Sequence, residues 1–313
     1  MEQGRNPAID RFRGFAILMM AVVDYLGGVR LVPAFLKHAP DIGFTFADAV
    51  APWFIFAIGL TYKPSFEKRL LEGALPAYLH AVTRYFAILG IGALLTAGGT
   101  AAAGRPTDWG VLQAIGGAGL VCLPFIRMPA SARFAAGAGL LLAYQFALDH
   151  GLLASVLASV QGGFFGIVSW GAMLVLATAM ADLRCKGTGP YALCCGGMAA
   201  AAILSAYLVP VSKHRVSCSY VLISLAIAGF LFLLFDVCSG RFKKPGVLCW
   251  WGENPLALYL LHLLVLGAYE LPAADWWYAG APVWLCALQL ALLLGLLTAF
   301  ARALHRRGIL IKL

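Results

Sequence analysis

The sequence contains few charged residues and lacks the short motifs that bind nucleotides in soluble enzymes. Only 12% of its 313 residues are charged, whereas 62% are hydrophobic. Soluble globular domains carry about 25% charged residues, so this composition excludes the ordinary soluble classes and predicts a polytopic membrane protein. The glycine clusters, such as Gly90-Ile91-Gly92, carry no P-loop lysine and favour close packing of helices instead.

Cysteine and histidine are present but lack the spacings of redox pairs and metal sites. The eight cysteines form no C-x-x-C pair, and the six histidines never occur at H-x-x-x-H spacing. Buried thiols behave as small hydrophobic groups, so we expect free structural cysteines, no disulfide framework and no bound metal. No internal repeat is evident, which weakens the interpretation as a transporter built from inverted halves.

Long apolar runs occupy most of the chain. Each run is about 16 to 21 residues long, near the length that crosses a hydrocarbon core of roughly 30 Å. The predicted fold class is therefore all-α, a polytopic membrane helix bundle of about ten spanning helices that forms a single domain over residues 1–313. The predicted spans are residues 12–28, 45–62, 77–97, 109–126, 131–148, 164–182, 190–209, 219–237, 254–270 and 283–301.

The basic residues predict the orientation of these spans. If the N-terminus is cytoplasmic, most of the 23 lysines and arginines lie inside, and only Arg30, Lys37, Arg105, Lys213 and Arg215 lie outside. This asymmetry follows the positive-inside rule, so both termini are expected in the cytoplasm, with no cleaved signal and with the first loop outside. The same distribution explains the net charge of +9 without nucleic acid. A bacterial cell membrane is the expected location.

The stretch from Asp10 to Tyr62 concentrates ionisable groups on and between the first two apolar segments. Such groups are costly within a hydrocarbon layer and by default mark a functional site. Because a helix turns about 100° per residue, Arg13 and Asp24 lie on one face of the first segment. The alternative for Asp10 is purely local, since it stands three residues before Arg13 and can cap the helix. Asp24 requires a partner or water.

Several motifs of this stretch resemble one family of membrane acyltransferases. They are Asp10-Arg11-Phe12-Arg13-Gly14, Lys37-His38-Ala39, Gly43-Phe44-Thr45-Phe46-Ala47-Asp48 and Pro52-Trp53-Phe54-Ile55-Phe56. Together they resemble the opening of the heparan-α-glucosaminide N-acetyltransferase family. Gly110-Val111-Leu112-Gln113 and Gly252-Glu253-Asn254-Pro255-Leu256, followed by Tyr259 and His262, resemble two further blocks of that family.

The resemblance implies an activity and a catalytic residue. It implies transfer of an acetyl group from cytoplasmic acetyl-CoA, a co-substrate and not a resident cofactor, to an extracytoplasmic amino sugar or glycan. The catalytic histidine of the family maps onto His38, which acts as a general base or forms an acetyl-imidazole. The family enzyme has Asn where this chain has Asp24, with a shorter spacer to the histidine. Asp24 either orients the imidazole or, if protonated, donates to the thioester oxyanion.

The remaining candidate residues are assigned to binding. Arg13 and Arg84 are expected to meet the phosphates of coenzyme A, because arginine binds phosphate in a bidentate manner. The other candidates are Asp10, Asp48, Gln113, Asn254 and His262, with a structural interhelical hydrogen bond as the alternative for His262. The expected partners are acyl-CoA, the acceptor and the lipid bilayer, with a homodimer as an option.

Two alternative functions remain at this stage. The same polar cavity is suited to a transporter or permease for a sugar or a lipid-linked substrate. A further enzyme alternative is an O-acyltransferase of envelope glycans. Consumption of acyl-CoA by the purified protein separates the transporter from the two enzymes.

Overall fold

The computed structural model describes residues 6–102, 109–241, 245–272 and 274–311, and every regular element in these ranges is helical. This confirms the predicted all-α class. The short 3₁₀ helices are Ala34–Leu36, Leu123–Phe125, Val160–Gly162 and Asp275–Trp277, and Leu148–Leu152 forms a π-helical turn. The α-helices are α1 (Pro7–Gly28), α2 (Phe46–Leu70), α3 (Ala74–Ala102), α4 (Val111–Cys122), α5 (Ala130–Ala147), α6 (Leu153–Leu157), α7 (Gly163–Cys185), α8 (Thr188–Leu208), α9 (Cys218–Ser239), α10 (Val247–Glu253), α11 (Pro255–Glu270) and α12 (Val283–Arg306).

Each predicted span overlaps one of these helices, although the boundaries differ. The first helix begins at Pro7, ahead of the predicted residue 12, because the Asn6 side chain caps it by accepting a hydrogen bond from Ala8 N at 2.9 Å. Asp10 therefore lies in the first turn of α1 and is not its cap, which corrects that alternative.

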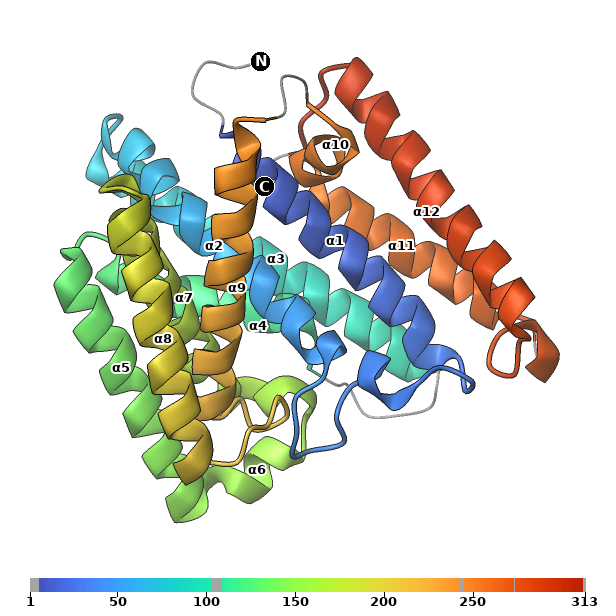
Figure 1. The fold of residues 1–313 in the computed structure, drawn as a ribbon, viewed down its shortest axis with the longest axis horizontal. Coiled ribbons are helices and arrows are strands. Elements are labelled where there is room, and N and C mark those ends of the chain that lie inside the picture. The colour runs from blue at the N-terminus through green and yellow to red at the C-terminus, as the bar shows by residue number, and fades with distance from the viewer. Residues whose placement is uncertain (1–5, 103–108, 242–244, 273, 312–313) are drawn as a thin grey trace. The chain divides into compact units, whose positions relative to one another are not determined.

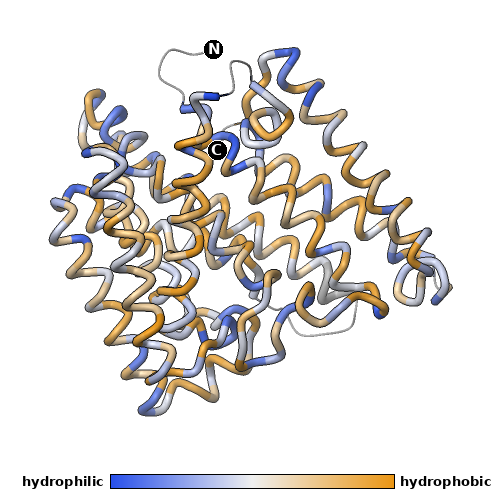
Figure 2. Tube along the Cα trace, viewed as in Figure 1, coloured by the Kyte–Doolittle hydropathy of each residue, from blue (hydrophilic) through white to orange (hydrophobic). Residues whose placement is uncertain are grey.

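Within the described residues, six helices are long and apolar enough to cross a membrane, which indicates an integral membrane protein. Hydrophobic residues run along much of α8, α9 and α12 in Figure 2. The six segments are Ala74–Gly98, Ala130–Leu157, Val160–Cys185, Thr188–Leu208, Cys218–Ser239 and Val283–Arg306. Val111–Phe125 and Pro255–Glu270 are shorter apolar helices.

The chain forms two compact units, and α2 and α9 contribute residues to both. Unit 1 comprises Met1–Ala39, Thr45–Phe54 and Leu231–Lys312. Unit 2 comprises Pro40–Phe44 and Ile55–Phe230. Most of the candidate site residues belong to unit 1, whereas Arg84 and Gln113 belong to unit 2.

In unit 1, α1 packs against α10, α11 and α12 (Figure 1). The contact with α10 is a close approach of two backbones. A Cβ at Gly14 would lie 1.8 Å from the Leu248 carbonyl oxygen, and one at Gly252 would lie 1.9 Å from the Asp10 carbonyl oxygen. Only glycine fits at these two positions, so the pair fixes the register of α1 against α10.

In unit 2, α7 is the most deeply buried of the membrane-length helices among the described residues, and it packs against α4, α5 and α8. An ionic cluster lies near the C-terminal end of α7. The Asp182 carboxylate accepts a hydrogen bond from Lys63 Nζ at 2.8 Å and pairs with the fully buried guanidinium of Arg133. A buried guanidinium requires such a partner, because an unpaired buried charge is strongly destabilising.

The segment of residues 40–44 is held in unit 2 by polar contacts with the loop before α9. Gly43 N donates to Val211 O at 2.8 Å, and the Asp41 carboxylate accepts hydrogen bonds from Arg215 and from Ser212 Oγ, the latter at 2.8 Å. The hydrogen bond from Arg215 is the main cause that lowers the pKa of Asp41. The carboxylate therefore stabilises the folded protein above the ordinary carboxyl pKa, and this stabilisation is lost as the pH falls through the lowered pKa.

We accordingly expect Asp41→Asn to lower the free energy of unfolding at pH 7 by about 0.5 to 1 kcal/mol. The effect is modest because the Asp41 side chain is 35% exposed and solvent screens the pair. Thermal unfolding from pH 7 downward measures it, and the difference between parent and variant should shrink below about pH 4. Equal midpoints of parent and variant at pH 7 would contradict this role.

Candidate active site

His38 and Asp48 form a carboxylate–imidazole pair at the start of α2. His38 Nδ1 lies 2.8 Å from Asp48 Oδ1. The His38 side chain is 44% exposed, whereas the Asp48 side chain is fully buried. The imidazole is therefore accessible while its carboxylate is shielded, which is the arrangement of a base and its orienting group.

Local sequence explains why Asp48 is fixed in this position. Asp48 lies in the first turn of α2, where its Oδ2 accepts hydrogen bonds from Thr45 N at 3.1 Å and from Ala39 N at 3.2 Å. The contact with Thr45 N is the reciprocal bond of a capping box. The Thr45 hydroxyl lies 2.9 Å from the same oxygen and 2.7 Å from Lys37 O, which ties the segment before His38 to the helix.

The hydrogen bonds to Asp48 favour one tautomer of His38. Backbone N–H groups donate to one Asp48 oxygen and His38 Nδ1 lies beside the other, and if the carboxylate is ionised it can only accept, so that His38 Nδ1 carries a proton and donates it. The lone pair that can take a proton from a substrate is then on Nε2. The pair can therefore perform general base catalysis.

Asp24 has a different partner from the one that the sequence suggested. Asp24 Oδ2 lies 2.9 Å from Nε2 of His262, which comes from α11. The carboxylate that contacts His38 Nδ1 is that of Asp48. The sequence predicted Asp48 only as a binding residue and Asp24 as the residue that orients His38. The structure instead places Asp48 beside the His38 imidazole, because the 37–48 segment folds back on the start of α2.

His262 is fully buried, and its Nδ1 makes no hydrogen bond within the described part of the chain. The His262 ring meets Tyr259 edge to face, with ring centroids 5.0 Å apart. The Asp24 side chain is 27% exposed, so the pair is reachable from the Asp24 side. A buried polar atom without a partner costs about 1 to 3 kcal/mol, so a water or a ligand that reached His262 Nδ1 would be stabilised there.

The end of α1 that carries Asp24 is anchored by tyrosines. The Tyr25 hydroxyl donates to Gln289 Oε1 at 2.8 Å, and the Tyr25 carbonyl accepts from the Tyr278 hydroxyl at 2.9 Å. Gln289 Nε2 in turn donates to Trp277 O at 2.9 Å. These buried hydrogen bonds hold the last turns of α1 and thereby fix the position of Asp24.

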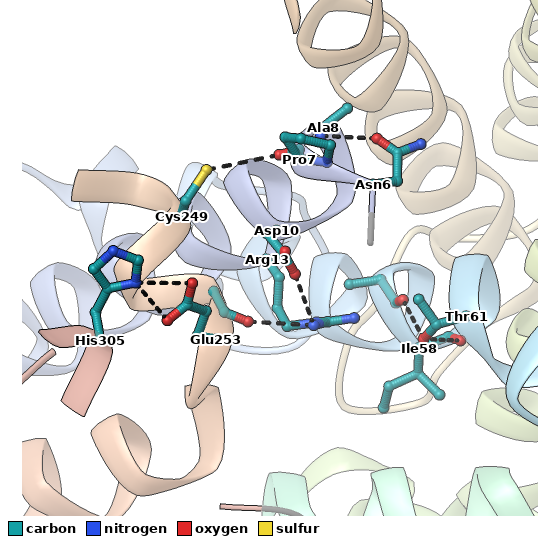
Figure 3. A network of polar contacts seen from close by, with 12 residues as sticks. Asn6, Pro7, Ala8, Asp10, Arg13, Ile58, Thr61, Cys249, Glu253 and His305 are labelled. Atoms are coloured by element: carbon teal, nitrogen blue, oxygen red, sulfur yellow. Dashed lines mark hydrogen bonds and ion pairs between the residues drawn. The ribbon is translucent and has the colours of Figure 1, made fainter. Parts of the chain in front are cut away.

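Arg13 lies in a second polar cluster at the opposite end of α1 (Figure 3). Its Nη1 lies 3.4 Å from Asp10 Oδ1 and donates to Gly252 O at 3.2 Å. This confirms the pair with Asp10 at i, i+3. In the same region Glu253 Oε2 lies 2.9 Å from His305 Nδ1, a pair that the sequence analysis missed. The Arg13 side chain is 20% exposed.

The other candidates lie in local hydrogen-bond networks. Asn254 Nδ2 donates to Ile309 O at 3.0 Å, and its Oδ1 accepts from Ile311 N at 2.7 Å, so its amide holds the segment after α12. Gln113 Oε1 accepts from Gly110 N at 3.1 Å, and its Nε2 donates to Thr96 Oγ1 at 2.9 Å. Gln113 thus caps α4 and joins it to α3.

The described ranges contain no cluster of three or more histidine, cysteine or acidic side chains that is able to hold a metal ion. The arrangement in unit 1 is instead one of acid–base pairs on apolar helices. The membrane-length helices and these pairs indicate an integral membrane protein whose apolar helices carry carboxylate–imidazole pairs.

Comparison with known proteins identifies the family. The model of the family "Heparan-alpha-glucosaminide N-acetyltransferase, catalytic" matches residues 5–176, more than half of the chain. The chain belongs to this family, which confirms the resemblance found in the motifs. Asp24, His38 and Asp48 lie within the matched residues, whereas His262 lies beyond them.

Two relatives are similar over shorter stretches. Human heparan-alpha-glucosaminide N-acetyltransferase is 39% identical over 69 residues, which cover 22% of this chain and 10% of the human protein. The mouse protein of the same name is 34% identical over 93 residues, 29% of this chain and 14% of the mouse protein. These matches span only a small part of the relatives' length.

Proposed function

We propose that the protein is a membrane acyltransferase that moves an acetyl group from acetyl-CoA to the amine or hydroxyl group of a sugar, most directly an amino sugar. Family membership and the relatives' names support the acetyltransferase class. The observation that carries the proposal is the exposed His38 imidazole held by the buried Asp48 carboxylate, with Nδ1 and Oδ1 2.8 Å apart.

In this mechanism the amine nitrogen or hydroxyl oxygen of the acceptor attacks the thioester carbonyl carbon, and His38 Nε2 takes the proton that this atom loses. Asp48 holds the imidazole in the required tautomer and stabilises the imidazolium. The C–S bond then breaks, and the coenzyme A thiolate takes the proton from the imidazolium. A covalent route uses the same geometry: Nε2 attacks the thioester carbonyl carbon, the C–S bond breaks and the coenzyme A thiolate leaves. The acceptor then attacks the acetyl-imidazole, the N–C bond to Nε2 breaks, and the proton lost by the acceptor is taken by the thiolate.

We propose that Asp24 acts on the thioester carbonyl. If His262 donates through Nε2 to Asp24 Oδ2, a proton on the other carboxyl oxygen is directed toward the developing oxyanion. An asparagine amide, which the family enzyme has at this position, supplies an equivalent donor. His262 then acts as a positioning residue for Asp24.

Substitution of Asp24 tests this role. We expect Asp24→Asn to keep turnover within about tenfold of the parent, because the amide still donates, and Asp24→Ala to lower it by roughly 10²-fold. Turnover of purified, folded variants with saturating acetyl-CoA measures both effects. Equal losses in the two variants would show that an ionised carboxylate, and not a hydrogen-bond donor, is required.

We propose that the donor is bound through Arg13. Its partly exposed guanidinium, held by Asp10 and by the Gly252 carbonyl, is placed to contact a phosphate of coenzyme A. Asn254 and Gln113 are proposed to contribute by fixing helix ends, as their hydrogen bonds favour. Arg84 of unit 2, whose guanidinium carbon lies 5.7 Å from the centroid of the Tyr85 ring, is proposed to contact a phosphate as well. A homodimer stays a prediction.

We further propose the predicted topology, a single transmembrane domain of about ten spans in a bacterial cell membrane, with both termini cytoplasmic and His38 outside. A tag inserted between Pro33 and Leu36 should react with a membrane-impermeant reagent added to intact cells, because this loop precedes His38. A tag at the α2–α3 turn, near Glu72, should react only after permeabilisation. Reaction of both tags from the same side would overturn the span count.

Release of free coenzyme A tests the proposed activity. Purified protein reconstituted in vesicles is supplied with acetyl-CoA and a panel of amino sugars and neutral sugars. Acceptor-dependent release is the expected result, with amino sugars preferred. Release with neutral sugars alone would indicate an O-acyltransferase of glycans, and no release with any acceptor would favour a transporter.

A further inference from the structure

The loop of residues 274–282, which leads into α12, contacts the end of α1 that carries Asp24. The Tyr278 hydroxyl donates to the carbonyl oxygen of Tyr25, the residue after Asp24, at 2.9 Å. Beyond the end of α1, Arg30 N donates to Ala279 O at 2.8 Å. All of these residues belong to unit 1. The loop therefore lies beside the end of α1 that the proposed mechanism uses.

The same loop is connected by polar contacts to the segment that carries His38. Lys37 Nζ donates to Arg30 O at 3.4 Å, and the Arg30 guanidinium pairs with the Asp275 carboxylate. The Arg30 and Asp275 side chains are 64% and 65% exposed. An accessible pair of opposite charges thus lies next to the segment with the imidazole, on the side where an acceptor would have to approach.

Trp276, the residue after Asp275, is an exposed aromatic side chain on a well-fixed turn. Trp276 is 63% exposed. Its 3₁₀ turn is held on both sides, since Gly280 N donates to Asp275 O at 2.7 Å and Gln289 Nε2 donates to Trp277 O at 2.9 Å. The Trp277 ring meets the Trp276 ring edge to face, with centroids 6.0 Å apart. A rigidly held aromatic side chain loses little conformational entropy on binding and is suited to hold a ligand.

A second exposed tryptophan, Trp284, has different surroundings. It begins a row of exposed apolar residues on α12 at intervals of four, which continues with Leu288, Leu292 and Leu296. Residues at this spacing share one helix face, and such a face on a membrane-length helix meets lipid, with tryptophan at the membrane interface. Lipid contact therefore accounts for Trp284. Trp276 instead precedes α12 and adjoins the ionic pair.

An indole next to a guanidinium and a carboxylate matches the chemistry of a sugar ring. One face of a pyranose carries C–H groups that stack on an aromatic ring, whereas the hydroxyl groups at its edge both donate and accept hydrogen bonds. Sites for small molecules commonly combine an aromatic surface with a few polar groups that fix the orientation of the ligand. A lipid acyl chain would use only the indole.

We propose that Trp276, Arg30 and Asp275 form a subsite that binds a sugar ring of the acceptor. The ring stacks on Trp276, and its hydroxyl groups accept from Arg30 and donate to Asp275. This inference rests on the proposed function and deepens it, because Trp276 then sets the affinity for the acceptor sugar. The subsite lies beyond residues 5–176, the part of the chain that the family model matches.

Saturation-transfer NMR tests the subsite without any acetyl transfer. The purified protein in nanodiscs receives glucosamine as the probe, with the open-chain polyol sorbitol as the control ligand, and saturation of aromatic protein protons passes to the protons of a bound sugar. The variants are Trp276→Ala and Asp275→Asn, whose side chains are exposed, so the fold should be kept. The matched control is Trp284→Ala, a similarly exposed tryptophan of the same unit.

We expect the ring protons of glucosamine to respond in the parent and in Trp284→Ala, and sorbitol to respond in neither. Trp276→Ala should bind glucosamine about tenfold more weakly, and Asp275→Asn a few-fold more weakly. In steady-state assays Trp276→Ala should raise the KM for glucosamine by a similar factor and leave the KM for acetyl-CoA unchanged. A loss confined to the acceptor is not expected from a general disturbance of the fold.

The proposal is overturned if Trp276→Ala binds glucosamine as tightly as the parent, or if the parent binds none. Equal losses in Trp276→Ala and Trp284→Ala would also overturn it, since both tryptophans would then act through the lipid interface. Binding that depends on Trp276, without release of coenzyme A by the parent, would contradict the proposed function and support the sugar subsite.

Discussion

Replacement of His38 by alanine should lower acetyl transfer by roughly 10²- to 10⁴-fold, which is the typical contribution of a positioned proton transfer. The affinity for coenzyme A should stay within a few-fold, because the proposed role of the imidazole lies in the transfer step and the proposed phosphate contacts come from arginine. Steady-state kinetics with an amino sugar, together with binding of coenzyme A, separates the two effects.

The matched control is His150→Ala, since His150 is an exposed histidine of unit 2 that lies outside the candidate site. It should retain the activity of the parent.

Raising the pH should partly restore turnover in His38→Ala with an amine acceptor, because solvent then supplies the deprotonated nucleophile. If high pH restores nothing, the covalent route is favoured, and trapping of acetylated parent protein in the absence of acceptor decides it. Turnover of His38→Ala close to the parent at neutral pH would exclude His38 as the base.

Replacement of Asp48 by asparagine should lower turnover about as much as replacement of His38, because it changes the hydrogen bonds that set the His38 tautomer. The carboxylate accepts from Ala39 N and Thr45 N through one oxygen and contacts His38 Nδ1 through the other. If the amide oxygen of the introduced asparagine keeps the backbone donors, its NH₂ group faces His38. The imidazole must then accept at Nδ1 and carry its proton on Nε2, so the base is in the wrong tautomer.

We therefore expect Asp48→Asn to lower turnover by roughly 10²- to 10⁴-fold while the protein stays folded. Circular dichroism and thermal unfolding verify the fold, since loss of a helix-capping carboxylate alone costs about 1 kcal/mol. A glutamate at this position is too long to restore the geometry and should not rescue turnover. A folded Asp48→Asn variant with the parent's turnover would show that the carboxylate is only a cap of α2.

Local patterns in the sequence were sufficient for several parts of this account. The apolar runs predicted the helices, and the spacing of Asp10 and Arg13 predicted their ion pair, because both features depend on residues within one or two helical turns. The motif around His38 was sufficient to identify the family. The Thr45-x-x-Asp48 spacing of a capping box was also present and would have revealed the fixed position of Asp48.

Partners that are distant along the chain were not predictable in this way. The pair of Asp24 with His262 depends on how α1 packs against α11, and the pair of Glu253 with His305 depends on α10 and α12. The span count was equally difficult, because α1 carries Asp10, Arg11, Arg13 and Asp24 and is less apolar than the six membrane-length helices. The ionisable residues that make α1 a candidate for function also lower its hydropathy. Composition alone therefore does not identify α1 as a membrane-spanning helix.

We propose above all that this chain transfers acetyl groups through His38. The most direct measurement is mass spectrometry of the acceptor after reconstituted parent and His38→Ala proteins receive acetyl-CoA labelled with ¹³C in the acetyl group and an amino sugar. We predict an N-acetylated sugar that carries the label with the parent protein, and a yield lower by roughly 10²-fold or more with His38→Ala under the same conditions. Equal labelling by both proteins, or no labelled product with the parent, would contradict this account.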